Sequence, residues 1–254
     1  PCEAGCRRKQ VDEAVSICLL KRYVGDEDLK TEKPYQPQLA ELSGKRVAII
    51  GAGPAGLAAA YYLQIKGHQA VIFEKNSKAG GELLQIDQET LPSEVVDQEV
   101  AQIVATGVQI RLNESIDNSR FAELHNEFDA VVISSGTVPE GSSVYGLNAT
   151  KAGIIADKSS YLTSIPKVFA IGHSVRTSKL AVRSVGQGKE VATVIDNYFK
   201  TAEVSGYPER FNSKFGRLAE VEFIQYKKDS ETAPRQKAEK SGFTREDAIR
   251  EAKR

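Results

Sequence analysis

A glycine-rich turn between a short apolar strand and a helix is the feature that most constrains the fold. Residues 51–56 read Gly-Ala-Gly-Pro-Ala-Gly and directly follow the apolar run 46–50. A helix is expected from about Pro54 to Lys66, because proline is tolerated in a first turn. A second apolar run at 69–74 ends on Glu74. A G-x-G-x-x-G turn in this setting is typical of a dinucleotide-binding βαβ unit.

Each residue type in this unit has a physical reason. Gly51 allows the tight turn, Gly53 lets a pyrophosphate approach the backbone, and Gly56 lets the helix lie close to the strand. The helix N-terminus offers N–H groups to the phosphates. Glu74 is expected to accept hydrogen bonds from the adenosine ribose, and its charge disfavours NADP. The spacing does not distinguish NAD from FAD. A turn without a ligand and a membrane span over 47–63 remain as alternatives.

Helices and strands alternate along most of the remaining chain. The predicted fold is α/β, a Rossmann-like domain with a parallel sheet and a short N-terminal helical segment. The predicted organisation is a helical segment with a linker at 1–44, the nucleotide-binding domain at 45–200 and a polar tail at 201–254. Further helices are expected at 7–24, 93–105, 117–126, 178–199 and 245–254, and further strands at 108–112, 128–134 and 168–171.

Composition excludes several classes of protein. The chain holds 34 Lys and Arg against 34 Asp and Glu, and this balance argues against a nucleic-acid or membrane-surface protein. Three cysteines do not make a disulfide scaffold, and no signal peptide is visible, so a cytoplasmic location is expected. The chain begins with Pro1, which indicates processing or a piece of a longer protein.

Four segments, taken in order, resemble one flavoprotein family. Residues 45–60 resemble its FAD fingerprint, and residues 73–84 resemble the stretch beside the flavin. Residues 128–136 and 163–172 resemble its two later FAD motifs. The family is that of the glutamate synthase small subunit, an FAD-dependent oxidoreductase family that includes the amino-terminal region of dihydropyrimidine dehydrogenase. The resemblance covers most of residues 1–200.

This resemblance implies FAD as the cofactor and adds residues to its site. The closing motif implies that Gly172 meets the ribityl and phosphate region, and that a helix around Lys179 points its N-terminus at the flavin. Position 173 is His where the family has Asp, so the usual acceptor is lost; a polar turn residue is the alternative role for His173. The matching segments also imply that further residues contact the cofactor: Pro54, Ala55, Lys75, Gly81, Glu82 and Gly136.

One family feature is expected to be missing. The family inserts an NADPH-binding domain between its last two FAD motifs, but here only residues 137–162 separate them. A βαβ unit needs about 30 residues or more, so no such domain is expected.

Cys2 and Cys6 match the last cysteines of the family's iron–sulfur domain. The resemblance implies that they ligate a [4Fe–4S] cluster in the intact protein, although such a cluster needs four thiolates. Two free thiols are the alternative. Cys18 is expected as a small core residue. Lys179, Arg183 and Lys189 could meet a phosphate or a partner, or form an ordinary solvated helix face.

The function expected from these features is electron transfer. FAD would exchange electrons with iron–sulfur centres of the same chain or of a partner, so an iron–sulfur protein or larger redox subunit is the expected partner. No nucleic acid and no membrane insertion are expected, and no side chain indicates a catalytic acid or base. The alternatives are an NAD(P)H-dependent flavin oxidoreductase and a non-catalytic scaffold that carries FAD in a redox complex.

Overall fold

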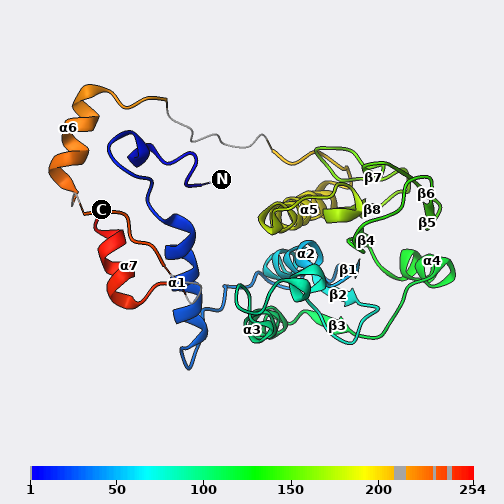
Figure 1. Ribbon diagram of the computed structural model, residues 1–254. Helices are drawn as coiled ribbons and strands as arrows, with labels where there is room; N and C mark the ends of the chain where they lie inside the picture. The colour runs from blue at the N-terminus through cyan, green and yellow to red at the C-terminus, as the bar shows by residue number, and fades with distance from the viewer. Residues whose placement is uncertain (1, 209–215, 231–232, 239–241) are drawn as a thin grey trace. The chain divides into compact units, whose positions relative to one another are not determined.

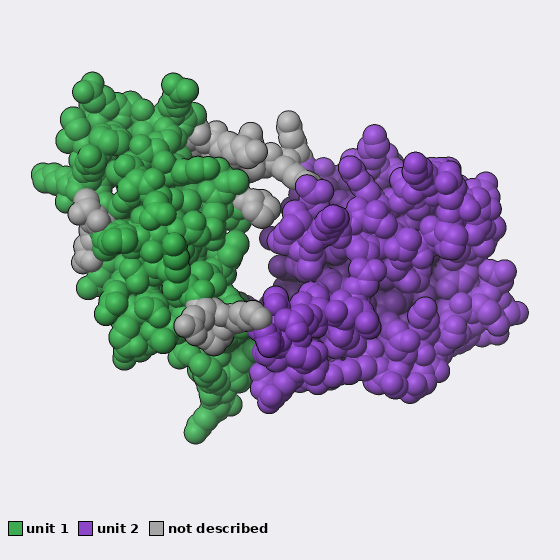
Figure 2. All heavy atoms as spheres, in the orientation of Figure 1, with its two compact units in different colours: residues 1–35, 209–254 green, residues 36–208 purple. Residues whose placement is uncertain are grey.

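The two ends of the chain belong to one compact unit, and the middle of the chain forms another. The computed structural model describes residues 2–208, 216–230, 233–238 and 242–254. Residues 36–208 form one compact unit, and residues 1–35 and 209–254 form the other (Figure 2). Both termini contribute to one of these units, and the predicted division at residues 44 and 200 stays a prediction.

A five-stranded parallel sheet forms the centre of the larger unit. Its strands lie in the order β3-β2-β1-β4-β8. In the register of the central strands, Ile49 lies beside Ile72 on one side and Val132 on the other. The expected α/β fold with a parallel sheet is confirmed. The strands are β1 (Arg46–Ile50), β2 (Gln69–Phe73), β3 (Gln109–Arg111), β4 (Ala130–Ile133) and β8 (Val168–Ala170).

Both faces of this sheet are covered (Figure 1). Val47 and Ile49 pack with the core residues of α2 (Pro54–Ile65) and α5 (Ala181–Thr201), next to α3 (Ser93–Ala105). Ala48 and Ile50 pack on the opposite face, against α4 (Asn118–Glu127) and a small antiparallel sheet. Burial on both faces explains the unbroken apolar runs of the central strands. The small sheet comprises β5 (Ser143–Val144), β6 (Leu147–Thr150) and β7 (Gly153–Ile154).

Small residues bring α5 against α2. A Cβ atom on Gly188 would lie 2.5 Å from the carbonyl oxygen of Ala55 and 2.7 Å from the Cβ atom of Ala58. Both distances are shorter than any normal van der Waals contact, so the two helix backbones approach as closely as a glycine permits. This contact sets the start of α5 near the glycine-rich turn at the start of α2.

A buried polar cluster ties the segment before β1 to α5. The Asp196 carboxylate contacts Nζ of Lys66 at 3.1 Å and Nε2 of His68 at 3.2 Å. Nδ1 of His68 lies 2.7 Å from Oγ of Ser43. Burial lowers the pKa of His68, and its hydrogen bond to Asp196 offsets only part of that effect. A neutral His68 therefore donates from Nε2 to Asp196 and accepts at Nδ1 from Ser43.

The smaller unit is assembled from short helices. The expected single helix over 7–24 is wrong, because a 3-10 turn, η1 (Arg7–Gln10), is separated from α1 (Ile17–Leu29) by non-helical residues. Cys18 lies exposed on α1, so its expected place in a core is also wrong. The tail contains α6 (Glu220–Asp229), which the sequence pattern did not predict, and α7 (Arg245–Ala252), which it did.

Glu251 joins the two ends of the chain inside this unit. Its side chain is fully buried on α7. Oε1 accepts hydrogen bonds from the backbone N–H of Ser16 at 2.7 Å and from Nη1 of Arg254 at 3.0 Å, and Oε2 accepts from the backbone N–H of Gln236 at 2.7 Å. A polar tail with few apolar residues thus folds through charge-assisted hydrogen bonds that meet buried donors.

The apolar run 47–63 is explained by β1, the glycine-rich turn and α2. Across the residues that the structure describes, no helix has the length and apolarity needed to cross a membrane.

Two glycines on α5 provide a test of the α2–α5 contact. Gly188→Ala should lower the free energy of unfolding by about 1–3 kcal/mol, because the added methyl group overlaps α2. Gly186 has no heavy atom within 4 Å of a Cβ position. Gly186→Ala should therefore raise the free energy of unfolding by about 0.5–1 kcal/mol, the difference in helix propensity. Urea denaturation measures both, and equal effects of the two changes would contradict the close approach.

The buried His68 should make stability depend on pH. Its pKa is lowered in the folded state, so below about pH 6.5 the unfolded chain binds a proton that the folded chain resists. The free energy of unfolding should fall as the pH drops from about 7 to 5. His68→Gln should flatten this slope in urea titrations.

His125 provides the matched control, because it lies at the solvent-accessible end of α4 with Nε2 near the carbonyl oxygen of Pro166. His125→Gln should keep the wild-type slope. A wild-type slope in His68→Gln would show that another group controls the pH dependence.

Candidate functional site

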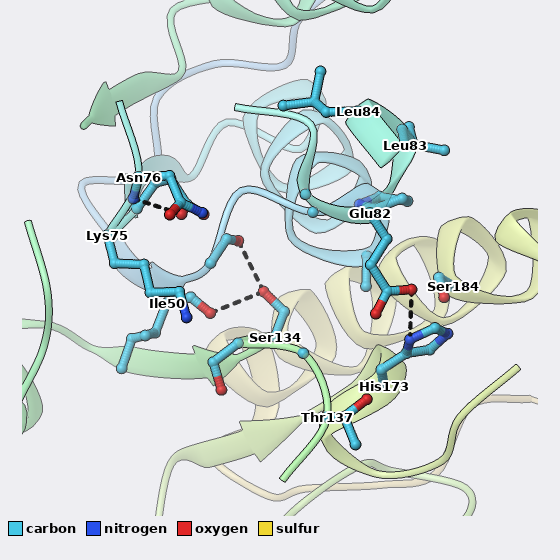
Figure 3. Close-up of a pocket in the computed structure, with 18 of the residues that line it drawn as sticks. Ile50, Lys75, Asn76, Glu82, Leu83, Leu84, Ser134, Thr137, His173 and Ser184 are labelled. Carbon is cyan, nitrogen blue, oxygen red and sulfur yellow. Dashed lines mark hydrogen bonds and ion pairs between the residues drawn. The ribbon is translucent and has the colours of Figure 1, made fainter. Parts of the chain in front are cut away.

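A cleft of about 910 Å³ opens at the carboxyl ends of the central strands. It lies where β1 continues to β2 on one side and neighbours β4 on the other, the position at which parallel α/β sheets bind ligands. Its volume is in the range of small-molecule and cofactor sites. Figure 3 shows side chains that line it, among them Ile50, Asn76, Glu82, Ser134 and His173.

The floor of the cleft is a close contact between the glycine-rich turn and the end of β4. Gly51 has a φ of +105°, and a Cβ atom there would lie 2.6 Å from the carbonyl oxygen of Ser134. A Cβ atom on Gly56 would lie 2.1 Å from the carbonyl oxygen of Gly51. Oγ of Ser134 lies within hydrogen-bond distance of the carbonyl oxygens of Ile50 and Gly51, at 3.1 and 3.0 Å (Figure 3). Neither glycine tolerates a side chain.

Gly53 has a different environment from its two neighbouring glycines. It caps the N-terminus of α2 and lines the cleft, yet no heavy atom lies within 4 Å of its Cβ position. Its missing side chain therefore leaves free space in the cleft, directly in front of the first N–H groups of α2. Pro54 and Ala55 continue the cleft wall from this point. Such a helix N-terminus attracts a phosphate group.

Glu74 supports the same turn from the end of β2. Its side chain is 5% exposed. Oε2 accepts a hydrogen bond from the backbone N–H of Ala52 at 2.8 Å, and Oε1 accepts one from the N–H of Asn76 at 2.9 Å. A carboxylate can accept about four hydrogen bonds. Glu74 thus holds the turn in place and keeps acceptor capacity for a hydroxyl group in the cleft that it lines.

Gly80 and Gly81 form a second pair of glycines, which packs against the turn. The N–H of Gly80 donates to the carbonyl oxygen of Ala52 at 2.8 Å, and a Cβ atom on Gly81 would lie 2.9 Å from Cα of Gly53. This contact places η2 (Gly81–Gln85) at the cleft rim. Glu82 then reaches from η2 toward His173.

His173 joins two sides of the cleft. It lies on η3 (Gly172–Ser174), where a Cβ atom on Gly172 would lie 2.8 Å from the Cβ atom of Ala55. Nδ1 of His173 lies 3.1 Å from Oε2 of Glu82 (Figure 3). Nε2 lies 3.2 Å from the backbone nitrogen of Ser178 and 2.9 Å from its carbonyl oxygen. With a proton on Nδ1 alone, the ring donates to Glu82 and its Nε2 accepts from the Ser178 N–H. With protons on both nitrogens, Nδ1 donates to Glu82 and Nε2 donates to the carbonyl oxygen of Ser178.

The structure brings most of the sequence-predicted residues to this one cleft. Gly56 and Gly172 are the exceptions, because they lie behind its wall where they allow close packing. The helix expected around Lys179 begins only at Ala181, so Lys179 lies in the preceding loop. The predicted residues that line the cleft are Gly51, Gly53, Pro54, Ala55, Glu74, Lys75, Gly81, Glu82, Gly136, His173 and Lys179.

Several lining residues were missed by sequence reasoning. Ser115 and Ile116 follow β3, and their position could have been found because β3 ends beside β2 in the same parallel sheet. Tyr145 comes from the small antiparallel sheet, which no pattern predicted. Its ring stacks on Phe121 at 4.4 Å, its hydroxyl donates to the carbonyl oxygen of Ile116 at 3.0 Å, and burial raises its pKa.

The cysteines do not form a metal site on their own. Cys2 and Cys18 are exposed, Cys6 is half-buried, and all three are free thiols. Among the residues with described positions, no three His, Cys, Asp or Glu side chains gather to hold a metal ion. The thiolates of this chain therefore do not suffice for a [4Fe–4S] cluster, which needs four.

Comparison with known proteins agrees with the geometry of the cleft. Residues 49–117 match the NAD(P)-binding Rossmann-like domain. The NAD-dependent dihydropyrimidine dehydrogenase subunit PreT of Escherichia coli K12 is 41% identical over 138 residues, which cover 53% of this chain and 33% of PreT. The NADH glutamate synthase of Schizosaccharomyces pombe is 37% identical over 145 residues, covering 55% of this chain and 7% of that protein.

A solved structure shares the fold. The ferredoxin-flavin thioredoxin reductase of Clostridium acetobutylicum superposes with a TM-score of 0.50 at 13% identity, over 62% of this chain and 99% of that one. The chain spans a third or less of the length of the curated relatives that it matches. The expected resemblance is confirmed: over about half of its length this chain is homologous to glutamate synthase and to dihydropyrimidine dehydrogenase subunits, and it carries a Rossmann-like dinucleotide-binding domain.

Proposed function

We propose that this chain is an FAD-binding electron-transfer module of a larger oxidoreductase. The observation that carries the proposal is the free space at Gly53, in front of the N-terminus of α2 and beside the buried carboxylate of Glu74. When bound, FAD would supply the redox chemistry by exchanging electrons with one-electron carriers. The chain's own residues would bind and orient it.

The cleft has features suited to both ends of a dinucleotide. Gly51, Gly53 and the first turn of α2 would hold the pyrophosphate, and Glu74 would accept from ribose hydroxyls on the side of β2 and β3. On the other side, Gly136, Lys179 and the first turn of α5 line the same cleft. This second side would receive the flavin end. The cleft fits a dinucleotide in both chemistry and space, because Gly53 leaves open space in front of the N–H groups that would bind the phosphates.

Two arrangements at the flavin end support FAD. The segments that resemble the family's last two FAD motifs end at Gly136, which lines the cleft, and at Gly172, which packs against Ala55 of the cleft wall. His173 replaces the expected acceptor, and the pair of His173 with Glu82 brings a carboxylate to that position instead. Lys75 and Gly81 would complete the contacts to the cofactor.

The electron partner would be an iron–sulfur protein or a larger redox subunit. PreT is named as a subunit of its enzyme, which supports a partner for this chain as well. A [4Fe–4S] cluster on Cys2 and Cys6 would need further thiolates beyond those of this chain. Three free cysteines suit a reducing compartment, so we place the protein in the cytoplasm.

A nicotinamide dinucleotide in the same cleft is the second candidate. The match of residues 49–117 to an NAD(P)-binding domain family favours it. Glu74 would then favour NADH over NADPH, because its carboxylate repels a 2′-phosphate. The residues between β4 and β8 form only the small three-stranded sheet, so a nicotinamide has no second nucleotide-binding domain there.

Two glycines of the same turn distinguish binding from folding. Gly53→Ala should weaken FAD binding at least about 10-fold, because the methyl group occupies the phosphate space. Its free energy of unfolding should stay within about 1 kcal/mol of the wild type. Gly56→Ala should lose about 2 kcal/mol or more of stability, because its methyl group meets the carbonyl oxygen of Gly51. Flavin fluorescence titration and urea denaturation measure the two effects.

Gly25→Ala serves as a control, since Gly25 also has no heavy atom within 4 Å of its Cβ position and no positive φ but lies outside the cleft. Wild-type FAD affinity in Gly53→Ala would contradict a phosphate site at the start of α2.

The source of electrons can be tested on the purified chain loaded with FAD. An anaerobic visible spectrum should show oxidised flavin that dithionite bleaches reversibly and that neither NADH nor NADPH bleaches. Rapid bleaching by NADH would favour the nicotinamide oxidoreductase instead. A chain that takes up no FAD would sink the electron-transfer proposal and favour a scaffold.

A further inference from the structure

Positive charge is concentrated in one part of the larger unit. Residues 36–208 contain 15 Lys and Arg against 18 Asp and Glu, so this unit carries a net negative charge. Residues 151–189 nevertheless hold seven of those cations and a single carboxylate, Asp157. The carboxylate of Asp157 is already engaged by the hydroxyl and N–H groups of Ser159 and Ser160. The negative charge of the unit lies elsewhere in its sequence.

Three of these cations stand together with exposed apolar side chains. Arg176, Lys179 and Arg183 are exposed, and in the described part of the chain none of them forms an ion pair. Among and after them, Leu180 is 37% exposed, Val182 63% and Val185 40%. We call this set the α5 rim patch: Arg176, Lys179, Leu180, Val182, Arg183 and Val185.

The α5 rim patch borders the cleft. Lys179 belongs to both, and Ala181 and Ser184, three residues apart on α5, line the cleft from its first turns. Ser184 is 7% exposed, whereas its neighbours on either side face the solvent. The helix N-terminus adds partial positive charge to that of the three cations. A molecule seated on the patch would therefore lie at the edge of the cofactor site.

We propose that the α5 rim patch is the docking surface for an acidic electron-transfer protein. This inference rests on the proposed function for the identity of the partner as a redox protein. Uncompensated cations steer an acidic partner to the cleft edge, and the exposed valines and leucine provide the apolar contact that it covers. Weak redox encounters use interfaces of less than about 1,200 Å², a size that a patch of few residues suits. A lone nucleotide phosphate would use the cations but would leave the apolar side chains exposed.

The test measures binding of the whole chain to an acidic plant-type [2Fe–2S] ferredoxin as probe. Calorimetry is performed at about 20 mM and about 200 mM salt, with and without FAD. Arg183→Glu and Val182→Ser change residues that do not line the cleft. Each should weaken ferredoxin binding about 5-fold at low salt. The Arg183→Glu effect should shrink at high salt because the charges are screened, whereas the Val182→Ser effect should persist.

Matched controls carry the same chemical changes at other exposed positions. Lys33→Glu and Val104→Ser should bind ferredoxin as the wild type does. A basic cytochrome c should bind the wild-type chain less tightly than ferredoxin does. Absence of ferredoxin binding, or wild-type binding by both patch variants, would overturn the proposal. Weaker binding of NADPH alone in Arg183→Glu, with ferredoxin binding unchanged, would overturn it in favour of a nucleotide phosphate.

The two proposals can fail separately. A chain that takes up no FAD, but whose ferredoxin binding is weakened by both patch variants, would keep the docking surface and remove the electron-transfer function. A chain whose FAD binds and is reduced by dithionite, but whose ferredoxin binding ignores both variants, would keep the function and remove the docking surface.

Discussion

The larger unit depends on how closely α2 approaches the end of β1. Gly56 allows the helix to rest on the carbonyl oxygen of Gly51, and Gly51 in turn rests on Ser134 at the end of β4. Because α2 lies this close to the end of β1, its residue Ala55 contacts Gly188 of α5. The first turn of α5 then opens onto the same cleft as the first turn of α2. A single larger side chain in this series of contacts would displace every later one, because protein interiors are close-packed.

The glycines of the same turn differ in what surrounds them. Gly51, Gly56 and Gly81 would each bring a Cβ atom against protein atoms, so the fold alone accounts for them. A Cβ atom on Gly53 would meet no protein atom within 4 Å, so the packing of the fold does not require a glycine there. Glu74 both supports the turn and lines the cleft. Its carboxylate accepts from two backbone N–H groups and retains lone pairs that no hydrogen bond of the described residues uses. The turn is thus held in its conformation by the protein's own contacts.

Local signals in the sequence predicted the larger unit well and the smaller unit poorly. The spacing from Gly51 to Glu74 predicted β1, α2 and β2, and the apolar pattern predicted the bounds of α3. These elements form over short stretches of chain, where period and turn chemistry are visible. The smaller unit depends on Glu251, whose partner Ser16 lies 235 residues away. No local pattern reports such a contact, and the four apolar residues of α6 are spread around the helix without forming one apolar face.

The cleft is lined by groups suited to holding a polar ligand. Beside the N-terminus of α2 at Gly53, its polar lining includes the carboxylate of Glu74, which two backbone N–H groups hold, and the pair of Glu82 with His173. The stretch between β4 and β8, all of whose residues the structure describes, holds three short strands and no helix, so it forms no second βαβ unit. Electrons would then have to enter and leave across the protein surface. In the proposed electron-transfer function, selectivity would lie in which molecules can approach the cofactor edge, and the exposed residues around the start of α5 would control that approach.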